Sequence, residues 1–151
     1  TTSNWSRSGD SGHAATSNTS ALLISPMRLL DLRRVLMALL TALEIHGRDL
    51  QDDRYEESHP VVTSRFDMHA LRRTPPSESA PYADGSPVIR ILYVMCRLDD
   101  GTEIAVVLRA GDKTPLGNSW YPPNRNEAEA RMEQYQREHP GVKAIVKRGD
   151  R

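Results

Sequence analysis

The sequence predicts an α+β domain in which a mainly antiparallel sheet of about four strands packs against two helices. Three patterns support this fold class. Leucines recur at helical spacing within residues 26–50, two apolar runs flank a glycine-containing turn at 99–102, and a second amphipathic segment occupies 126–138. Segregated helices and strands of this kind favour an antiparallel sheet with helices packed on it. The length of 151 residues suits one domain.

Residues 1–24 are expected to form a flexible tail ahead of a single domain at 25–151. Ten of the first twenty residues are Ser or Thr, and Trp5 is the only large apolar side chain among them. A segment of this composition buries too little apolar surface to offset the entropy cost of ordering.

The long N-terminal helix is expected to cover residues 26–50. Pro26 suits its first position, where a missing N–H is tolerated. A heptad-like seam then follows at spacings of three and four residues: Leu29, Leu32, Leu36, Leu39, Leu43, His46 and Leu50. Leu30, Met37 and Leu40 widen the apolar stripe beyond this seam. A helix this apolar needs cover on more than one side, which favours its own sheet on one side and a partner on the other.

Four stretches are expected to form strands. The clearest hairpin joins residues 88–98 to 103–109, with Gly101 in the turn. Residues 88–98 are apolar on both alternating faces, as is typical of a central strand. A short β-like run at 61–66 precedes the hairpin, and an alternating, lysine-protected strand at 142–147 follows it.

A long loop is expected at residues 74–87, which contain four prolines. The C-terminal-half helix is expected to begin at Asn126, because Glu129 three residues later completes a capping-box pattern. It is expected to end at 139–141, His-Pro-Gly. Its narrow apolar stripe faces the sheet through Ala128, Met132 and Tyr135.

Composition excludes several classes of function. Twenty Lys and Arg balance twenty Asp and Glu, so no strong overall field attracts nucleic acid or an anionic membrane. The single Cys96 excludes an internal disulfide and a Cys-rich zinc site. No apolar run is long enough to span a bilayer, and the polar N-terminal residues lack the pattern of a secretory signal. We therefore expect a soluble, intracellular protein.

No metal or cofactor is predicted. No histidine pair has the spacing of zinc ligands on a helix, and no nucleophile elbow is present. The segment Gly111-Asp-Lys-Thr114 lacks the preceding glycine and the following helix of a phosphate-binding loop. Cys96 lies inside the expected central strand, where burial disfavours a thiolate.

One alternative is a small, metal-independent RNA-cleaving effector enzyme. Such a site needs general acid and base groups that converge in one cleft. The candidate residues are His59, His69, Arg65, Arg72 and Arg73.

Another alternative is a nucleic-acid-binding accessory protein with one basic strand face. Its candidate residues are Arg90, Arg97, Arg109, Lys143 and Lys147, with Tyr93 as a stacking platform.

The leading hypothesis is a non-enzymatic protein–protein interaction or accessory module. The leucine-rich helix at 28–50 would provide its contact, with a protein partner or with a second copy in a dimer. The excess of apolar helix surface and the absence of a recognisable catalytic spacing favour this hypothesis.

Overall fold

The computed structural model describes residues 26–52, 55, 57–72 and 88–146, with the side chains of the first helix described from residue 33 onward. The predicted tail at 1–24 and the predicted loop at 74–87 therefore lie outside the described residues. None of the described helices combines the length and apolar character that crossing a membrane requires.

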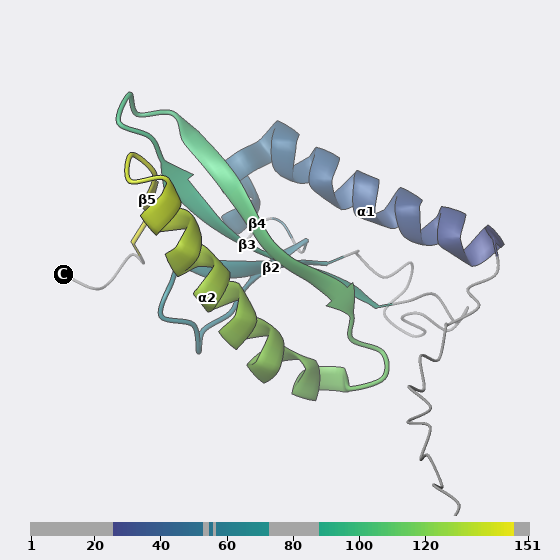
Figure 1. Ribbon diagram of the computed structural model, residues 1–151. Coiled ribbons are helices and arrows are strands. Elements are labelled where there is room, and N and C mark those ends of the chain that lie inside the picture. Colours follow the sequence, from purple (N-terminus) through teal and green to yellow (C-terminus); the bar gives the residue numbers. More distant parts are fainter. Residues whose placement is uncertain (1–25, 53–54, 56, 73–87, 147–151) are drawn as a thin grey trace, which may run out of the picture.

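The predicted α+β class is confirmed, because a five-stranded antiparallel sheet packs with two helices (Figure 1). Four strands follow the order β1-β2-β3-β4, and β5 pairs with the end of β3. Their bounds are β1 Ser58–Pro60, β2 Met68–Arg72, β3 Ile89–Arg97, β4 Glu103–Asp112 and β5 Lys143–Ala144. The predicted hairpin corresponds to β3 and β4, and its turn contains Gly101 at a φ of 88°.

Strand β3 is the centre of the molecule, since its first eight residues are buried. Leu92, Val94 and Cys96 point into the core cluster that also contains Ala128 and Met132 of the second helix. The intervening Ile91, Tyr93 and Met95 point into the cluster that contains the leucines of the first helix, Leu39 and Leu43. The two helices therefore cover opposite faces of the sheet, as Figure 1 shows.

Helix α1 spans Pro26–His46, and a 3₁₀ turn, η1, continues from Gly47 to Gln51. The predicted helix extended to residue 50, but it ends four residues earlier, where Gly47 adopts a φ of 52°. Glycine reaches this left-handed region without steric cost and commonly ends helices for that reason. Leu50 of η1 is nevertheless buried and extends the packing of α1 on the sheet.

Helix α2 spans Tyr121–Glu138 and follows a short 3₁₀ turn, η2, at Gly117–Trp120. The predicted start at Asn126 was wrong, because the helix begins five residues earlier. Pro122 and Pro123 occupy its first turn, where a missing N–H costs no helical hydrogen bond. The predicted end and the predicted apolar stripe are confirmed, with Ala128 and Met132 fully buried.

The predicted strand at 61–66 was wrong, since these residues form the connection between β1 and β2. Val61 N donates to the Met68 carbonyl at 2.8 Å, and Ser64 N donates to the Val61 carbonyl at 2.9 Å, which folds the segment back on itself. The predicted strand position at 61–66 therefore lies between two strands, β1 before it and β2 after it. The predicted strand at 142–147 shortens to the two residues of β5.

Replacing a buried leucine of α1 should test how strongly the helix packs on the sheet. We expect Leu43→Ala to lower the free energy of unfolding by about 2–5 kcal/mol, because it removes buried methyl groups and leaves a cavity. The matched control Ile45→Ala, at a side chain of the same helix that is 71% exposed, should change it by less than about 0.5 kcal/mol. Urea unfolding followed by circular dichroism measures both; equal effects would contradict the packing.

Candidate functional site

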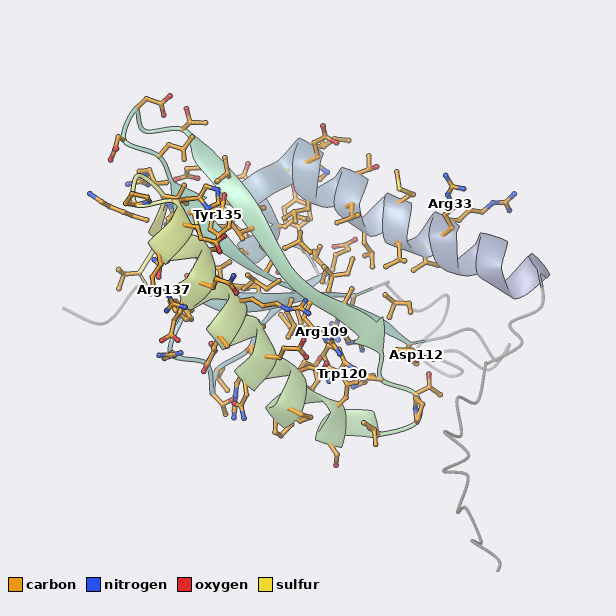
Figure 2. The ribbon with its side chains drawn as sticks, in the orientation of Figure 1. Arg33, Arg109, Asp112, Trp120, Tyr135 and Arg137 are labelled. Atoms are coloured by element: carbon orange, nitrogen blue, oxygen red, sulfur yellow. The ribbon has the colours of Figure 1, made fainter. Side chains whose placement is uncertain are left out.

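Basic side chains gather at one end of the sheet, on the face that α2 covers. Arg90 of β3 lies directly opposite Arg72 of β2 in the strand register. Both share a face with Leu92 and Ala70, which belong to the core cluster under α2. Figure 2 labels Trp120 and Asp112 at this end of the sheet. Like charges directly opposite each other on neighbouring strands destabilise a sheet, so this arrangement of two arginines carries an electrostatic cost.

Arg90 is only 7% exposed, although it carries a permanent positive charge. Its Nε donates to the hydroxyl of Tyr121 at 3.2 Å, and its Nη1 donates to the carbonyl of Ile89 at 2.9 Å. Both acceptors are neutral. Moving a guanidinium from water into the protein costs free energy, and neutral acceptors offset only part of that cost. An anion would offset more of it.

Lys113 approaches the same tyrosine from another side. Its Nζ lies 5.4 Å from the centre of the Tyr121 ring and donates to Asn118 Oδ1 at 3.0 Å. Burial lowers the pKa of Lys113, and the positive charges of Arg90 and Arg72 lower it further. We call Arg72, Arg90 and Lys113 the basic cluster. Tyr121 thus binds one cation of the cluster at its hydroxyl and another over its ring.

A small pocket adjoins the basic cluster. Its volume is about 190 Å³, and its lining residues are His59, Pro60, Val61, Val62, Thr63, Ala70 and Tyr121. Ala70 lies two residues before Arg72 on the same face of β2, and Tyr121 contacts Arg90. The pocket and the basic cluster therefore adjoin each other at Tyr121.

A second polar group lies on the opposite face of the sheet, and we call it the buried polar chain. The hydroxyls of Tyr93 and Ser58 are 2.8 Å apart, Ser58 Oγ lies 3.4 Å from His69 Nδ1, and His69 Nε2 lies 3.2 Å from Asp67 Oδ1. Burial raises the pKa of Tyr93. Ser, His and Asp in this order invite comparison with a nucleophile and its base.

The geometry of the buried polar chain favours a structural role. Ser58 is 8% exposed, and its nearest polar partner among these residues is Tyr93, which is fully buried. His69 is likewise only 7% exposed, so a substrate has little access to either side chain. The chain therefore joins β1, β2 and β3 through hydrogen bonds that satisfy buried polar groups.

The structure does not bring the candidate catalytic histidines together. His59 pairs with Ala70, whereas His69 pairs with Pro60 and lies near Tyr93. Because neighbouring residues of a strand point to opposite faces, the two imidazoles lie on opposite sides of the sheet. Arg72 belongs to the basic cluster, and Arg73 lies outside the described residues.

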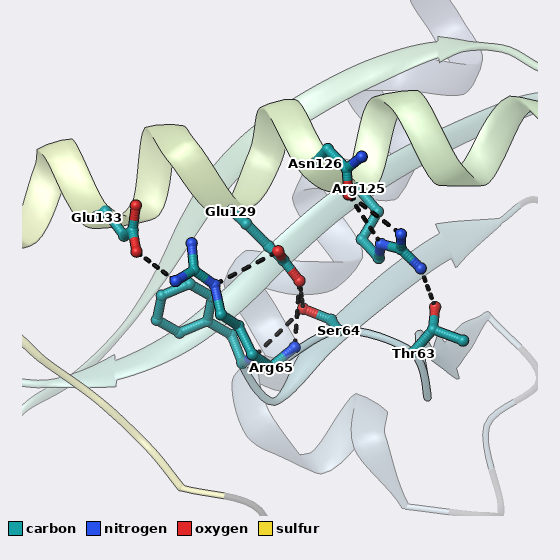
Figure 3. A network of polar contacts seen from close by, with 8 residues as sticks. Thr63, Ser64, Arg65, Arg125, Asn126, Glu129 and Glu133 are labelled. Atoms are coloured by element: carbon teal, nitrogen blue, oxygen red, sulfur yellow. Dashed lines mark hydrogen bonds and ion pairs between the residues drawn. The ribbon is translucent and has the colours of Figure 1, made fainter.

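Arg65, the remaining catalytic candidate, belongs to a network that ties the 61–67 connection to α2 (Figure 3). Its guanidinium pairs with Glu133 and, at 3.4 Å, with Glu129. Glu129 also accepts a hydrogen bond from Ser64 Oγ at 2.9 Å. These contacts give Arg65 a role in positioning the connection.

The candidate nucleic-acid residues do not form one basic face. Arg90 lies in the basic cluster, whereas Arg97 pairs with Glu103 at 2.8 Å at the far end of β3. Arg109 bonds Asn124 and Glu127 of α2. Lys143 is exposed on β5, Lys147 lies outside the described residues, and the buried Tyr93 offers no stacking surface.

Sequence reasoning missed Lys113 and Tyr121 as parts of a site. Lys113 belongs to the Gly111–Thr114 segment, which lacks the pattern of a phosphate-binding loop. Lys113 could have been predicted from the pairing of the two hairpin strands, which sets the end of one beside the start of the other. In the structure, Lys113 N donates to the Val88 carbonyl at 2.9 Å. That bond places the lysine next to the start of the strand that carries Arg90.

The leucine seam packs on the chain's own sheet wherever its leucines are described. Leu39, Leu43 and Leu50 are at most 5% exposed, and Leu36 is half-buried against the same cluster. His46 is exposed, and its ring centre lies 5.4 Å from that of Tyr55. The side chains of Leu29 and Leu32 lie outside the described residues. The open surface of α1 is therefore on another side of the helix.

Within the described residues, no three His, Cys, Asp or Glu side chains gather as a metal site would require. Comparisons of the chain with protein-family models, with curated proteins and with solved structures find no significant match.

Cys96 should be chemically inert while the protein is folded. The residue is fully buried, and burial raises the pKa of its thiol to about 11. Because the thiolate is the reactive form, we expect slow labelling by a thiol reagent at pH 8 in buffer and fast labelling in urea. The raised pKa also means that stability falls as the pH rises from about 8.5 toward 11. Rapid labelling of the native protein would contradict this burial.

Proposed function

We propose that this chain is a non-enzymatic interaction module that pairs with a second copy of itself through the outer side of α1. The observation that carries the proposal is a stripe of exposed residues spaced four, three and four apart. We call these residues, Arg33, Met37, Leu40 and Glu44, the outer stripe. Met37 is 55% exposed and Leu40 37% exposed. Figure 2 shows Arg33 extending from α1 away from the sheet.

The charges of the outer stripe favour an antiparallel pair of helices. A two-fold axis between residues 38 and 39 would set Met37 against Leu40 of the second copy and Arg33 against Glu44 of the second copy. Each contact would then occur twice, as in any two-fold symmetric interface. Parallel helices in register would instead set Arg33 beside Arg33 and Glu44 beside Glu44, and these like charges repel.

The size of the stripe indicates a weak dimer. Stable protein interfaces usually bury ~1,200–2,000 Å² in total, which is more than a few turns of one helix supply. We therefore expect assembly to depend on protein concentration.

The separation of the catalytic candidates supports binding over the RNA-cleaving alternative. His59 and His69 lie on opposite faces of the sheet, and Arg65 is engaged by two glutamates of α2. A general acid and a general base must both reach the substrate, directly or through one water. This pair of histidines does not share such a cleft.

Charge reversal tests both the dimer and its orientation. We expect Arg33→Glu and Glu44→Arg each to weaken self-association by on the order of tenfold, because each creates two like-charge contacts. The double variant should restore association, since the opposite charges meet again. Sedimentation velocity over a series of protein concentrations measures each dissociation constant.

Two further variants separate assembly from folding. Met37→Asp should abolish the dimer, whereas Val62→Asp, at a residue 77% exposed beside the pocket that Tyr121 lines, should leave it unchanged. Leu43→Asp is unsuitable because it places a carboxylate in the core. A wild-type protein that stays monomeric throughout the series refutes the proposal, and failure of the double variant to recover refutes the antiparallel arrangement.

A further inference from the structure

We propose that β4 binds an extended peptide segment of a partner protein, which adds to the sheet as a further antiparallel strand beside residues 103–107. We call these residues, Glu103 to Val107, the open edge. Strand β4 ends the order β1-β2-β3-β4, and among the described strands it pairs with β3 alone (Figure 1). Because the open edge belongs to the sheet, this proposal does not depend on the pairing of α1.

The backbone of the open edge presents hydrogen-bonding groups to solvent. In an antiparallel pair, residues that bond to the neighbouring strand alternate with residues whose N–H and C=O groups point to the other side. Leu98 N donates to the Thr102 carbonyl at 2.8 Å, which makes these two residues a bonded pair. The alternation then turns the N–H and C=O groups of residues 103, 105 and 107 away from β3.

The β3 residue opposite Ala105 supports this assignment. Met95 pairs with Ala105 in the register, and its carbonyl accepts a hydrogen bond from Ile145 N at 2.9 Å, on the side of β3 away from β4. The backbone groups of Met95 therefore point away from Ala105. No described hydrogen bond occupies the outer side of residues 103, 105 and 107, so each offers one N–H and one C=O to an added strand.

The other described edges of the sheet carry features that prevent strand pairing. Strands β1 and β5 have three and two residues, and β1 ends in Pro60, which has no N–H. Farther along β4, Leu108 is an extra residue at a shift in register, and Arg131 of α2 donates to its carbonyl at 2.7 Å. The open edge contains no proline, no lysine and no bulge, so this stretch alone is left able to pair.

Apolar side chains on both faces of the open edge favour β-branched residues in the ligand. Val107 is 46% exposed and lies opposite Tyr93, whose side chain belongs to the cluster under α1. Ile104 is half-buried against the cluster under α2. An added strand would set alternate side chains beside these two residues, and β-branched side chains pack well on such a surface. Binding of this kind takes its affinity from main-chain hydrogen bonds and its specificity from the alternate side chains.

The end of the open edge next to the turn is acidic. Asp99 and Asp100 form the turn before β4, and neither makes a described ion pair. Glu103 is paired with two arginines, at 2.8 and 3.3 Å. The exposed Lys143 lies on β5, on the other side of β3. The unpaired charges that an added strand would meet at this end are therefore negative.

The opposite end of the open edge is basic. Arg109 and Arg131 share one carboxylate, Glu127, at 3.2 and 2.7 Å, which leaves one positive charge in excess. The N-terminus of an antiparallel ligand lies at this end and its C-terminus at the turn. The ligand that fits is therefore an extended, β-branched segment with acidic residues at its N-terminal end and basic residues at its C-terminal end.

The probe is a fluorescein-labelled peptide, Glu-Glu-Val-Thr-Val-Thr-Val-Lys-Lys, titrated with the full chain and followed by fluorescence anisotropy. We expect saturable binding. Exchanging the charged ends, in Lys-Lys-Val-Thr-Val-Thr-Val-Glu-Glu, should weaken binding about threefold to tenfold at low salt, because both ends then meet like charges. Equal binding of these two peptides would refute the proposed direction of the ligand.

A third peptide tests the main-chain hydrogen bonds without any change to the protein. It has the sequence of the first peptide with its five central residues N-methylated, so it lacks the donors that an added strand needs. We expect no measurable binding. Equal binding of the N-methylated peptide, or no saturable binding of the first peptide, overturns the proposal.

Amide hydrogen exchange measured by NMR locates the peptide. In the free protein the amides of Ala105 and Val107 should exchange quickly, and those of Ile104 and Val106, which bond to β3, slowly. The peptide should slow exchange at Ala105 and Val107. Absence of this protection refutes the site. Protection at both residues in the free protein that disappears on dilution would assign the open edge to a second copy of the chain and refute a partner peptide as its occupant.

Proline variants test the site from the side of the protein. Val107→Pro should weaken binding of the first peptide at least about tenfold, because it removes an outward N–H from the open edge. The matched control is Val146→Pro, at a valine 71% exposed just after β5, which pairs with the other side of β3. Wild-type binding in Val107→Pro, or an equal loss in Val146→Pro, would contradict the proposed site. If Val107→Pro fails to fold, the N-methylated peptide and the exchange pattern still decide the question.

Discussion

The need to bury both faces of β3 determines how the rest of the chain is arranged. Its first eight residues are buried, so each face needs an apolar layer of its own. Helix α2 covers one face through Ala128 and Met132, and α1 with η1 covers the other through leucines. The remaining strands extend the sheet sideways from this centre. Removing either layer would expose a continuous row of apolar side chains from a single strand.

The same arrangement separates the polar features of the molecule. The basic cluster and its pocket lie on the α2 face, near Tyr121, where this helix begins. The buried polar chain lies on the other face and is closed by its own hydrogen bonds. The outer stripe lies farther out, on the solvent side of α1. The sheet therefore separates the basic cluster from the outer stripe.

Local periodicity predicted the two helices and the β3–β4 hairpin, because their patterns depend on neighbouring residues. The short strands β1 and β2 were missed, since β1 has three residues, including His59 and Pro60, and gains its structure from pairing with β2. The second helix was predicted to begin at Asn126, although Pro122 and Pro123 already lie in the first turn of α2. Periodicity indicated that the leucine seam must be buried, but it could not show whether the chain's own sheet or a partner buries it. The basic cluster depends on cross-strand register, which sequence spacing does not contain.

Gly111 contributes to the basic end of the sheet by having no side chain. A Cβ at this position would lie 3.0 Å from Trp120 Nε1, so the indole rests directly on the backbone of β4. The indole in turn meets the Tyr121 ring edge-on, with ring centres 5.3 Å apart. The bare backbone of one strand thus sets the depth at which two consecutive aromatic rings sit. A single methyl group added at this position would push on the indole and, through it, on the tyrosine ring that lies between the basic cluster and the pocket.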